Sequence, residues 1–189
     1  MNKLIKLGLA TTILGTSVFS VGNYESEASI KKVKVNPLSK SFIKSYANHS
    51  SISYAGIKPG MALTQVEKKL GKDKKVFNYF LRKPIYEYGD VGVFYDNDQS
   101  EPVTSKSKVW FVSVIVRDTS KSKFIKAWGK PNYVFISHGQ DFNKYYYDLN
   151  KKDKYLEVVN YRGNEIYFIE KTTKNNFNRY DKKYVKKYK

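Results

Sequence analysis

An internal repeat constrains the fold of this chain more than any other feature of its sequence. Residues 63–77 read LTQVEKKLGKDKKVF, and residues 121–135 read KSKFIKAWGKPNYVF. When the two segments are aligned on Gly71 and Gly129, apolar, small polar and lysine positions coincide. Self-similarity of this kind indicates a structural unit that occurs more than once in a chain. We therefore expect a duplication, with two units of the same construction in tandem.

Each repeated segment has the pattern of a short helix. In the first, Leu63, Val66 and Leu70 fall on one face at helical spacing. Thr64, or Ser122 in the second segment, can cap the helix, and the aligned glycine can end it in a left-handed conformation. The sequence thus predicts a helix at the start of each unit.

Antiparallel strands are expected after each helix. Aromatic and β-branched residues are concentrated in eight segments separated by turn residues, which is typical of strands. The predicted strands are 74–81, 84–89, 91–96 and 107–117 in the first unit, and 132–138, 142–148, 154–161 and 164–170 in the second. The expected fold class is α+β, with one helix-plus-sheet unit at residues 57–118 and another at 119–170.

The segments that flank the two units differ from them in composition. Residues 29–56 hold five lysines and no acid, and residues 37–47 have the spacing of a short helix. Residues 171–189 hold eight basic residues and one acid, with Phe177, Tyr180, Tyr184 and Tyr188 three or four positions apart. This last segment is predicted to be either an amphipathic basic helix with an aromatic stripe or a frayed, disordered tail.

The first 28 residues have the pattern of a secretory signal. Lys3 and Lys6 precede an uncharged run at residues 7–21, and Ser26 and Ala28 stand where signal peptidase reads small residues. We therefore expect cleavage after Ala28. The run falls short of the ~20 residues that a membrane-spanning helix needs. The sequence predicts a secreted, extracellular protein that can associate loosely with the cell surface, without stable membrane insertion.

The absence of cysteine adds two constraints. With no cysteine in 189 residues, neither a disulfide nor a thiolate metal site can stabilise the fold, and a cysteine-linked lipid anchor is excluded. Stability must therefore come from packing, for which seventeen tyrosines and eleven phenylalanines supply the apolar area.

The formal net charge of +18 favours polyanionic partners such as DNA or RNA, sulfated glycans and teichoic acids. Lysine acts as a point charge, and only four of the 35 basic residues are arginine, so we expect binding without sequence preference. Exposed tyrosines interleaved with lysines could stack on bases. The candidate polyanion-binding residues are Lys68, Lys69, Lys72, Lys74, Lys75, Lys123, Lys126, Lys130, Lys144, Arg179, Tyr180, Lys182, Lys183, Tyr184, Lys186 and Lys187.

Residues that could support catalysis are few. The two histidines, His49 and His138, lie far apart without metal-ligand spacing. The acids Asp90, Asp96, Asp98 and Glu101 fall in one region, but without the spacing of a calcium loop, so a solvated turn is expected there. We therefore expect a non-enzyme with no cofactor and no metal.

Two resemblances add to this interpretation. The run Gly60-Met61-Ala62-Leu63-Thr64-Gln65-Val66 with Leu70-Gly71 resembles the signature of BamE-like small lipoproteins and of β-lactamase inhibitory protein, which implies helix-then-sheet units that are often duplicated. Residues 60–117, through Val66 to Asp73, Gly92 to Tyr95 and Val109 to Val112, resemble the secreted immunodominant staphylococcal antigen B family. That resemblance implies nucleic-acid binding without sequence preference, in a virulence setting, and has no counterpart in the second unit or the tail.

The sequence therefore supports three hypotheses. The first is a secreted, sequence-independent binder of polyanions, meaning extracellular nucleic acid or an anionic glycopolymer. The alternative is a secreted protein-interaction module or inhibitor of a host protein that acts in virulence. The third is a hydrolase that would depend on His49 or His138. Because a duplicated unit can pair with itself within one chain, we expect a monomer.

Overall fold

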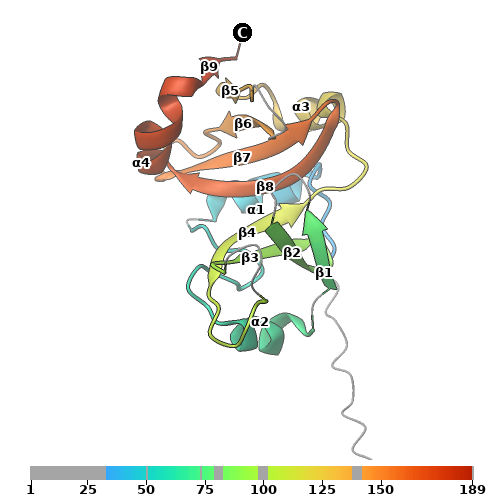
Figure 1. Cartoon of the computed structure of the whole chain (residues 1–189). Helices are drawn as coiled ribbons and strands as arrows, with labels where there is room; N and C mark the ends of the chain where they lie inside the picture. Colours follow the sequence, from blue (N-terminus) through green and yellow to red (C-terminus); the bar gives the residue numbers. More distant parts are fainter. Residues whose placement is uncertain are drawn as a thin grey trace, which may run out of the picture.

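One antiparallel sheet runs through the molecule in the order β1-β2-β3-β4-β8-β7-β6-β5-β9 (Figure 1). The computed structural model describes residues 33–49, 51–72, 74–78, 83–97, 102–137 and 142–188. The strands are β1 (Lys74–Asn78), β2 (Lys83–Tyr88), β3 (Val91–Tyr95), β4 (Val109–Ile115), β5 (Tyr133–Phe135), β6 (Asn143–Tyr147), β7 (Tyr155–Arg162), β8 (Glu165–Thr173) and β9 (Lys186–Lys187). The helices are α1 (Lys40–Asn48), α2 (Leu63–Leu70), α3 (Lys121–Trp128) and α4 (Lys174–Asn176), which continues into η1 (Phe177–Asp181) and η2 (Lys182–Tyr184). The predicted α+β class is confirmed.

The strand order divides the sheet into two halves that meet at its centre. Strands β1–β4 follow α2 and strands β5–β8 follow α3, and the halves join where β4 pairs with β8. The paired residues at this junction are Val114 with Ile169 and Ile115 with Phe168. Each half therefore consists of one helix followed by four strands, and the last strand of each half is central.

The repeated glycines end their helices in the same way. Gly71 and Gly129 have φ angles of 85° and 83°, a region that favours glycine. Their N–H groups donate to the carbonyl oxygens of Glu67 and Ile125, both at 2.8 Å. The glycine conserved between the two repeated segments thus has the same structural role in both.

The helix caps differ from those expected from the sequence. The cap of α2 is Ala62, whose N–H donates to Gln65 Oε1 at 2.9 Å. The cap of α3 is Ser120, whose hydroxyl accepts from the N–H of Lys123. Thr64 and Ser122 instead lie within the first turn of their helices, because α2 begins at Leu63 and α3 begins at Lys121.

The strand motifs of the repeat are offset by one strand. Phe94-Tyr95 lies in β3, the third strand after α2, whereas the similar Tyr146-Tyr147 lies in β6, the second strand after α3. The two units therefore match in their helices, in the glycines and in the first strands, β1 and β5. The similar strand segments that follow do not occupy equivalent strands.

Helices α1, α2 and α3 cover one face of the sheet. Phe42 and Tyr46 of α1 and Phe124 and Trp128 of α3 pack with inward-facing side chains of β4, β6, β7 and β8. Val66 and Leu70 of α2 pack in the same way on β2, β3 and β4. Burying each of these large side chains contributes about 1.5–3 kcal/mol, so this face holds most of the core. None of the helices in the described part of the chain has the length and apolar character needed to cross a bilayer.

The opposite face of the sheet is covered at one end by the C-terminal segment. Phe177 of η1 is buried against Tyr146, Leu156 and Val158. β9 then pairs with β5 and becomes the last strand at that end. The aromatic stripe expected at Phe177, Tyr180, Tyr184 and Tyr188 is therefore divided, because the segment changes from helix to strand: Phe177 is buried, Tyr180 and Tyr184 are exposed, and Tyr188 packs against the core.

The segment at residues 33–49 spans the junction between the two halves. The N–H of Val35 donates to Asp90 Oδ2 in the first half at 2.9 Å. Trp128 Nε1 in the second half donates to the carbonyl oxygen of Pro37 at 2.8 Å. α1 then begins at its cap, Ser39, and lies behind β4 and β8 in Figure 1. This segment therefore holds the two halves together from the helical side.

A buried ion pair lies beneath α1. Lys171 Nζ is 3.3 Å from Glu157 Oε1, and the two side chains are 2% and 1% exposed. The same ammonium donates to the carbonyl oxygen of His49 at 2.7 Å and lies 5.2 Å from the centre of the Tyr46 ring. Burial raises the pKa of Glu157, and the charge of Lys171 partly offsets that increase. The expected boundary before residue 171 therefore falls inside β8, where Lys171 is a core residue.

Removing one member of this pair is expected to destabilise the protein strongly. Lys171→Met leaves Glu157 buried without its counter-ion, and the free energy of unfolding should fall by about 3–5 kcal/mol. The double variant Glu157→Met/Lys171→Met should regain most of that loss, because no unpaired charge remains. Urea unfolding at neutral pH measures both effects.

A matched control is available in the same region. Lys174 pairs with Asp148 at 2.8 Å, but both side chains are 27% exposed, so Lys174→Met should cost less than about 1 kcal/mol. If the Lys171 and Lys174 variants lost equal amounts of unfolding free energy, the buried pair would contribute no more to stability than the partly exposed one.

Candidate functional site

The predicted polyanion-binding residues fall into three separate groups on the molecule. Lys68, Lys69 and Lys72 are exposed on or just after α2, and Lys123, Lys126 and Lys130 are exposed on or just after α3. The third group, Arg179 to Lys187, belongs to the C-terminal segment. Lys74 and Lys75 lie in β1, but their side chains are outside the described part, as are Ala28 and His138. The structure therefore does not bring all of the candidates together.

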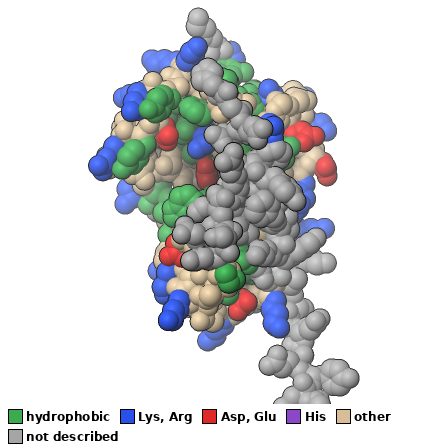
Figure 2. Space-filling view, viewed as in Figure 1, with side chains coloured by type: hydrophobic (Ala, Val, Ile, Leu, Met, Phe, Trp, Pro, Cys, Tyr) green, Lys and Arg blue, Asp and Glu red, His purple; other side chains and the backbone are tan. Residues whose placement is uncertain are grey.

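The C-terminal group is a run of exposed basic and aromatic residues, which we call the Tyr-Lys surface. Its residues are Arg179, Tyr180, Lys182, Lys183, Tyr184, Lys186 and Lys187, all of them exposed. Figure 2 shows basic and hydrophobic side chains intermixed at the upper left of the molecule, where Figure 1 places this segment. The surface exists because Phe177 and β9 fix the segment to the sheet at both ends.

Two tyrosine side chains on this surface are largely exposed to solvent. Tyr180 and Tyr184 are 55% and 61% exposed. The guanidinium of Arg179 lies 5.2 Å from the centre of the Tyr180 ring, and Lys183 Nζ lies 4.7 Å from that of Tyr184. Among the described residues, no ion pair involves a cation of the Tyr-Lys surface. Positive charge and aromatic faces are thus presented together to solvent.

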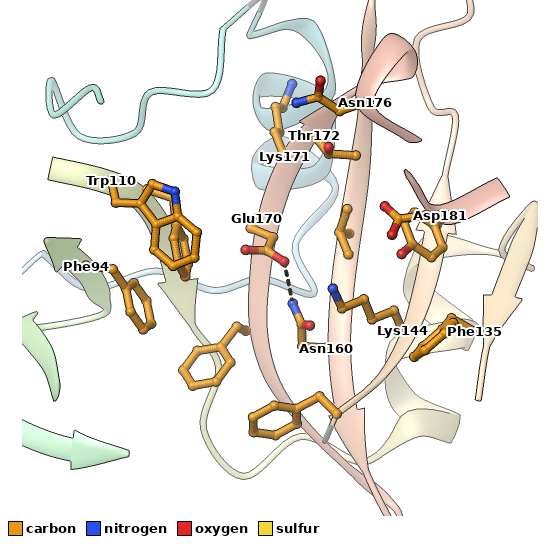
Figure 3. A pocket seen from close by; sticks show the side chains of 15 residues that line it. Phe94, Trp110, Phe135, Lys144, Asn160, Glu170, Lys171, Thr172, Asn176 and Asp181 are labelled. Carbon is orange, nitrogen blue, oxygen red and sulfur yellow. Dashed lines mark hydrogen bonds between the residues drawn. The ribbon is translucent and has the colours of Figure 1, made fainter. Parts of the chain in front are cut away.

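A second feature lies on the face of the sheet that α1–α3 leave uncovered. It is a groove of about 630 Å³ between Trp110 on β4 and Asp181 on η1 (Figure 3). Phenylalanine side chains from β3, β4, β5 and β8 contribute to its lining. Lys144, the remaining predicted residue, is half-buried here rather than on the Tyr-Lys surface.

Polar groups are placed at the middle of this groove. Asn160 Nδ2 donates to Glu170 Oε1 at 3.1 Å, and Lys144 is the neighbour of Asn160 across β6 and β7. Burial raises the pKa of Tyr146, and the nearby Asp181 and Glu170 carboxylates raise it further. Trp110, Asn160 and Glu170 are not among the residues predicted from the sequence. The signal for Asn160 and Glu170 is that each is a polar residue within a predicted aromatic strand.

Among the described residues, histidine and acidic side chains have structural partners and do not assemble into a catalytic centre. His49 Nε2 hydrogen-bonds the hydroxyls of Ser53 at 2.9 Å and Ser51 at 3.1 Å on an exposed loop. Asp90 accepts from Val35 N and pairs with Arg117, and Asp96 accepts from Lys108 N, so both acids have structural roles. Within the described ranges, no group of three or more His, Asp or Glu side chains could hold a metal ion.

Comparison with known proteins gives no relative for this chain. No family model matches it, no curated protein matches it, and no solved structure matches it. The two surfaces described above therefore carry the functional argument.

The exposure of the tyrosines can be checked by chemical modification. Tetranitromethane should nitrate Tyr180 and Tyr184 first, because their rings are open, while Tyr146 and Tyr147 should stay unmodified because they are buried and burial raises the pKa of both. Peptide mapping by mass spectrometry identifies the sites. Early nitration of Tyr146 would contradict the docked position of the C-terminal segment.

Proposed function

We propose that this protein is a secreted, non-enzymatic polyanion-binding protein that binds without sequence preference through its Tyr-Lys surface. The observation that carries the proposal is the pair of exposed rings, Tyr180 and Tyr184, with cations beside them and no acidic partner described for those cations. Flexible single-stranded nucleic acid fits this arrangement best, because phosphates pair with lysines while bases stack on aromatic rings.

The chemistry of the surface favours affinity over base recognition. Four of its five cations are lysines, which act as point charges, and the one guanidinium belongs to Arg179. Phosphate contacts of this kind add affinity and carry no sequence information. The lysines on α2 lie in the other half of the sheet, so they contribute to the long-range attraction of a polyanion rather than to direct contact.

Secretion and organisation are parts of the same proposal. The signal-like N-terminus at residues 1–28 supports export, although these residues are outside the described part of the chain. The helix-then-strands order of both halves, with matching glycine ends, supports an origin by duplication of a BamE-like unit. A monomer is consistent with the way the two halves complete one sheet within a single chain.

The proposal predicts binding that depends steeply on salt. Labelled oligo(dT) should bind the purified protein, and log affinity should fall linearly with log salt concentration. The variant Lys182→Ala/Lys183→Ala/Lys186→Ala/Lys187→Ala should lose up to about 0.7 of slope for each phosphate contact removed. Tyr180→Ala/Tyr184→Ala should weaken binding by about 1–3 kcal/mol per stacked base with little change in slope. Fluorescence anisotropy across a salt series measures both quantities.

A control of nearly equal charge change separates local contact from overall charge. Lys68→Ala/Lys69→Ala/Lys72→Ala removes three exposed lysines from α2 and its end, in the other half of the sheet, and should change affinity much less. Equal losses for the two sets would mean that net charge alone drives binding. If heparin bound as tightly as oligo(dT) and the tyrosine variant bound both normally, the ligand would be an anionic glycopolymer rather than nucleic acid.

A further inference from the structure

The groove on the open face of the sheet has the size and lining of a small-molecule site. Its volume of about 630 Å³ lies within the ~300–1,000 Å³ that such sites usually have. Most of its wall is apolar and aromatic, and a few polar groups converge at its middle, as is typical of ligand pockets. The Tyr-Lys surface does not enter the groove, although Asn176 and Asp181 of the same segment form part of its wall.

The charges in the groove argue against an ionic ligand. Glu170 and Asp181 place two carboxylates there, and a polyanion would be repelled by both. Lys144 is the one cation aligned with the groove's polar centre, because Lys171 is directed to the other face and paired with Glu157. Among the described residues, no ion pair joins Lys144 to an acid, so a cationic ligand would meet an ammonium without a counter-ion.

A ligand with hydroxyl groups matches this mixture of donors and acceptors. A hydroxyl can donate to the Glu170 or Asp181 carboxylate and can accept from the Lys144 ammonium. Asn160 Nδ2 donates to Glu170 Oε1, and the side-chain carbonyl oxygen of Asn160 is a further acceptor. Figure 3 shows Lys144, Asn160 and Glu170 together in the middle of the groove.

The aromatic wall narrows the class of ligand further. Trp110 is 55% exposed and stands at one side of the groove, opposite Asp181 (Figure 3). An indole ring offers a broad apolar face, and the C–H face of a pyranose ring is apolar while its rim is polar. A sugar can therefore place one face on Trp110 and direct its hydroxyls to the polar centre.

We propose that this groove is a binding site for a neutral saccharide, separate from the Tyr-Lys surface. The protein then has two recognition surfaces of different chemistry, one for a polyanion and one for uncharged sugar units. The groove argument does not depend on polyanion binding, because it rests on Trp110, Lys144, Asn160 and Glu170.

The experiment titrates the purified protein with three uncharged oligosaccharides: chitotetraose, maltotetraose and cellotetraose. Isothermal calorimetry and the fluorescence of Trp110 should report binding of at least one of them, with little dependence on salt. Trp110→Ala and Glu170→Gln should each weaken that binding, the second by at least about tenfold, because it removes a charged acceptor. Thermal unfolding of each variant confirms that it is folded.

Two comparisons keep this proposal distinct from the proposed function. Tyr184→Ala should leave saccharide binding unchanged, and Trp110→Ala should leave oligo(dT) binding unchanged. Absence of binding by all three oligosaccharides at millimolar concentration would overturn the proposal. So would unchanged binding in both groove variants, or displacement of the saccharide by oligo(dT), since that would place the polyanion in the groove.

Discussion

The pairing of β4 with β8 is the contact on which the rest of the structure depends. Val114 pairs there with Ile169 and Ile115 with Phe168, and the N–H of Val116 donates to the carbonyl oxygen of Tyr167 at 2.8 Å. This short ladder turns two four-stranded halves into one sheet. On one face Val114 and Ile169 join the core beneath α1, and on the other Ile115 and Phe168 belong to the cluster beside the groove. A ladder this short is weak by itself, and in a chain without cysteine it has to be reinforced by packing.

The reinforcement comes from segments distant in sequence. Residues 33–49 contact Asp90 in one half and Trp128 and Lys171 in the other, so ordering this segment stabilises both halves at once. The Lys171–Glu157 pair places a buried charge where α1 crosses β7 and β8, which favours one register over alternatives that would leave the charge unpaired. The groove lies on the opposite face of the sheet, which is open because α1, α2 and α3 all pack on one face.

Sequence patterns predicted most of the secondary structure, because helical spacing and strand composition are local signals, but they did not predict the strand β9 in the C-terminal segment. The helical spacing of Val66 and Leu70, the glycines after each helix, and the aromatic and β-branched runs placed three helices and eight strands close to their observed bounds. Placement in space was harder, because it depends on contacts between distant residues. Lys171 looks like the start of a basic tail, and only its proximity to Glu157 makes it a core residue. In the sequence Lys144 resembles the exposed lysines, and only the strand register, which places it beside Asn160, shows that it lines the groove.

The two-residue strand β9 has a consequence for how the protein behaves at high concentration. An exposed strand edge is a template on which further strands can add, and proteins often block such edges with short strands and lysines. β9 ends the sheet with Lys186 and Lys187, both exposed, so another copy arriving at this edge would have to place its backbone beside two like charges. The lysines that we propose bind a polyanion would therefore also discourage self-assembly into fibrils, and a polyanion that neutralised them would remove that protection.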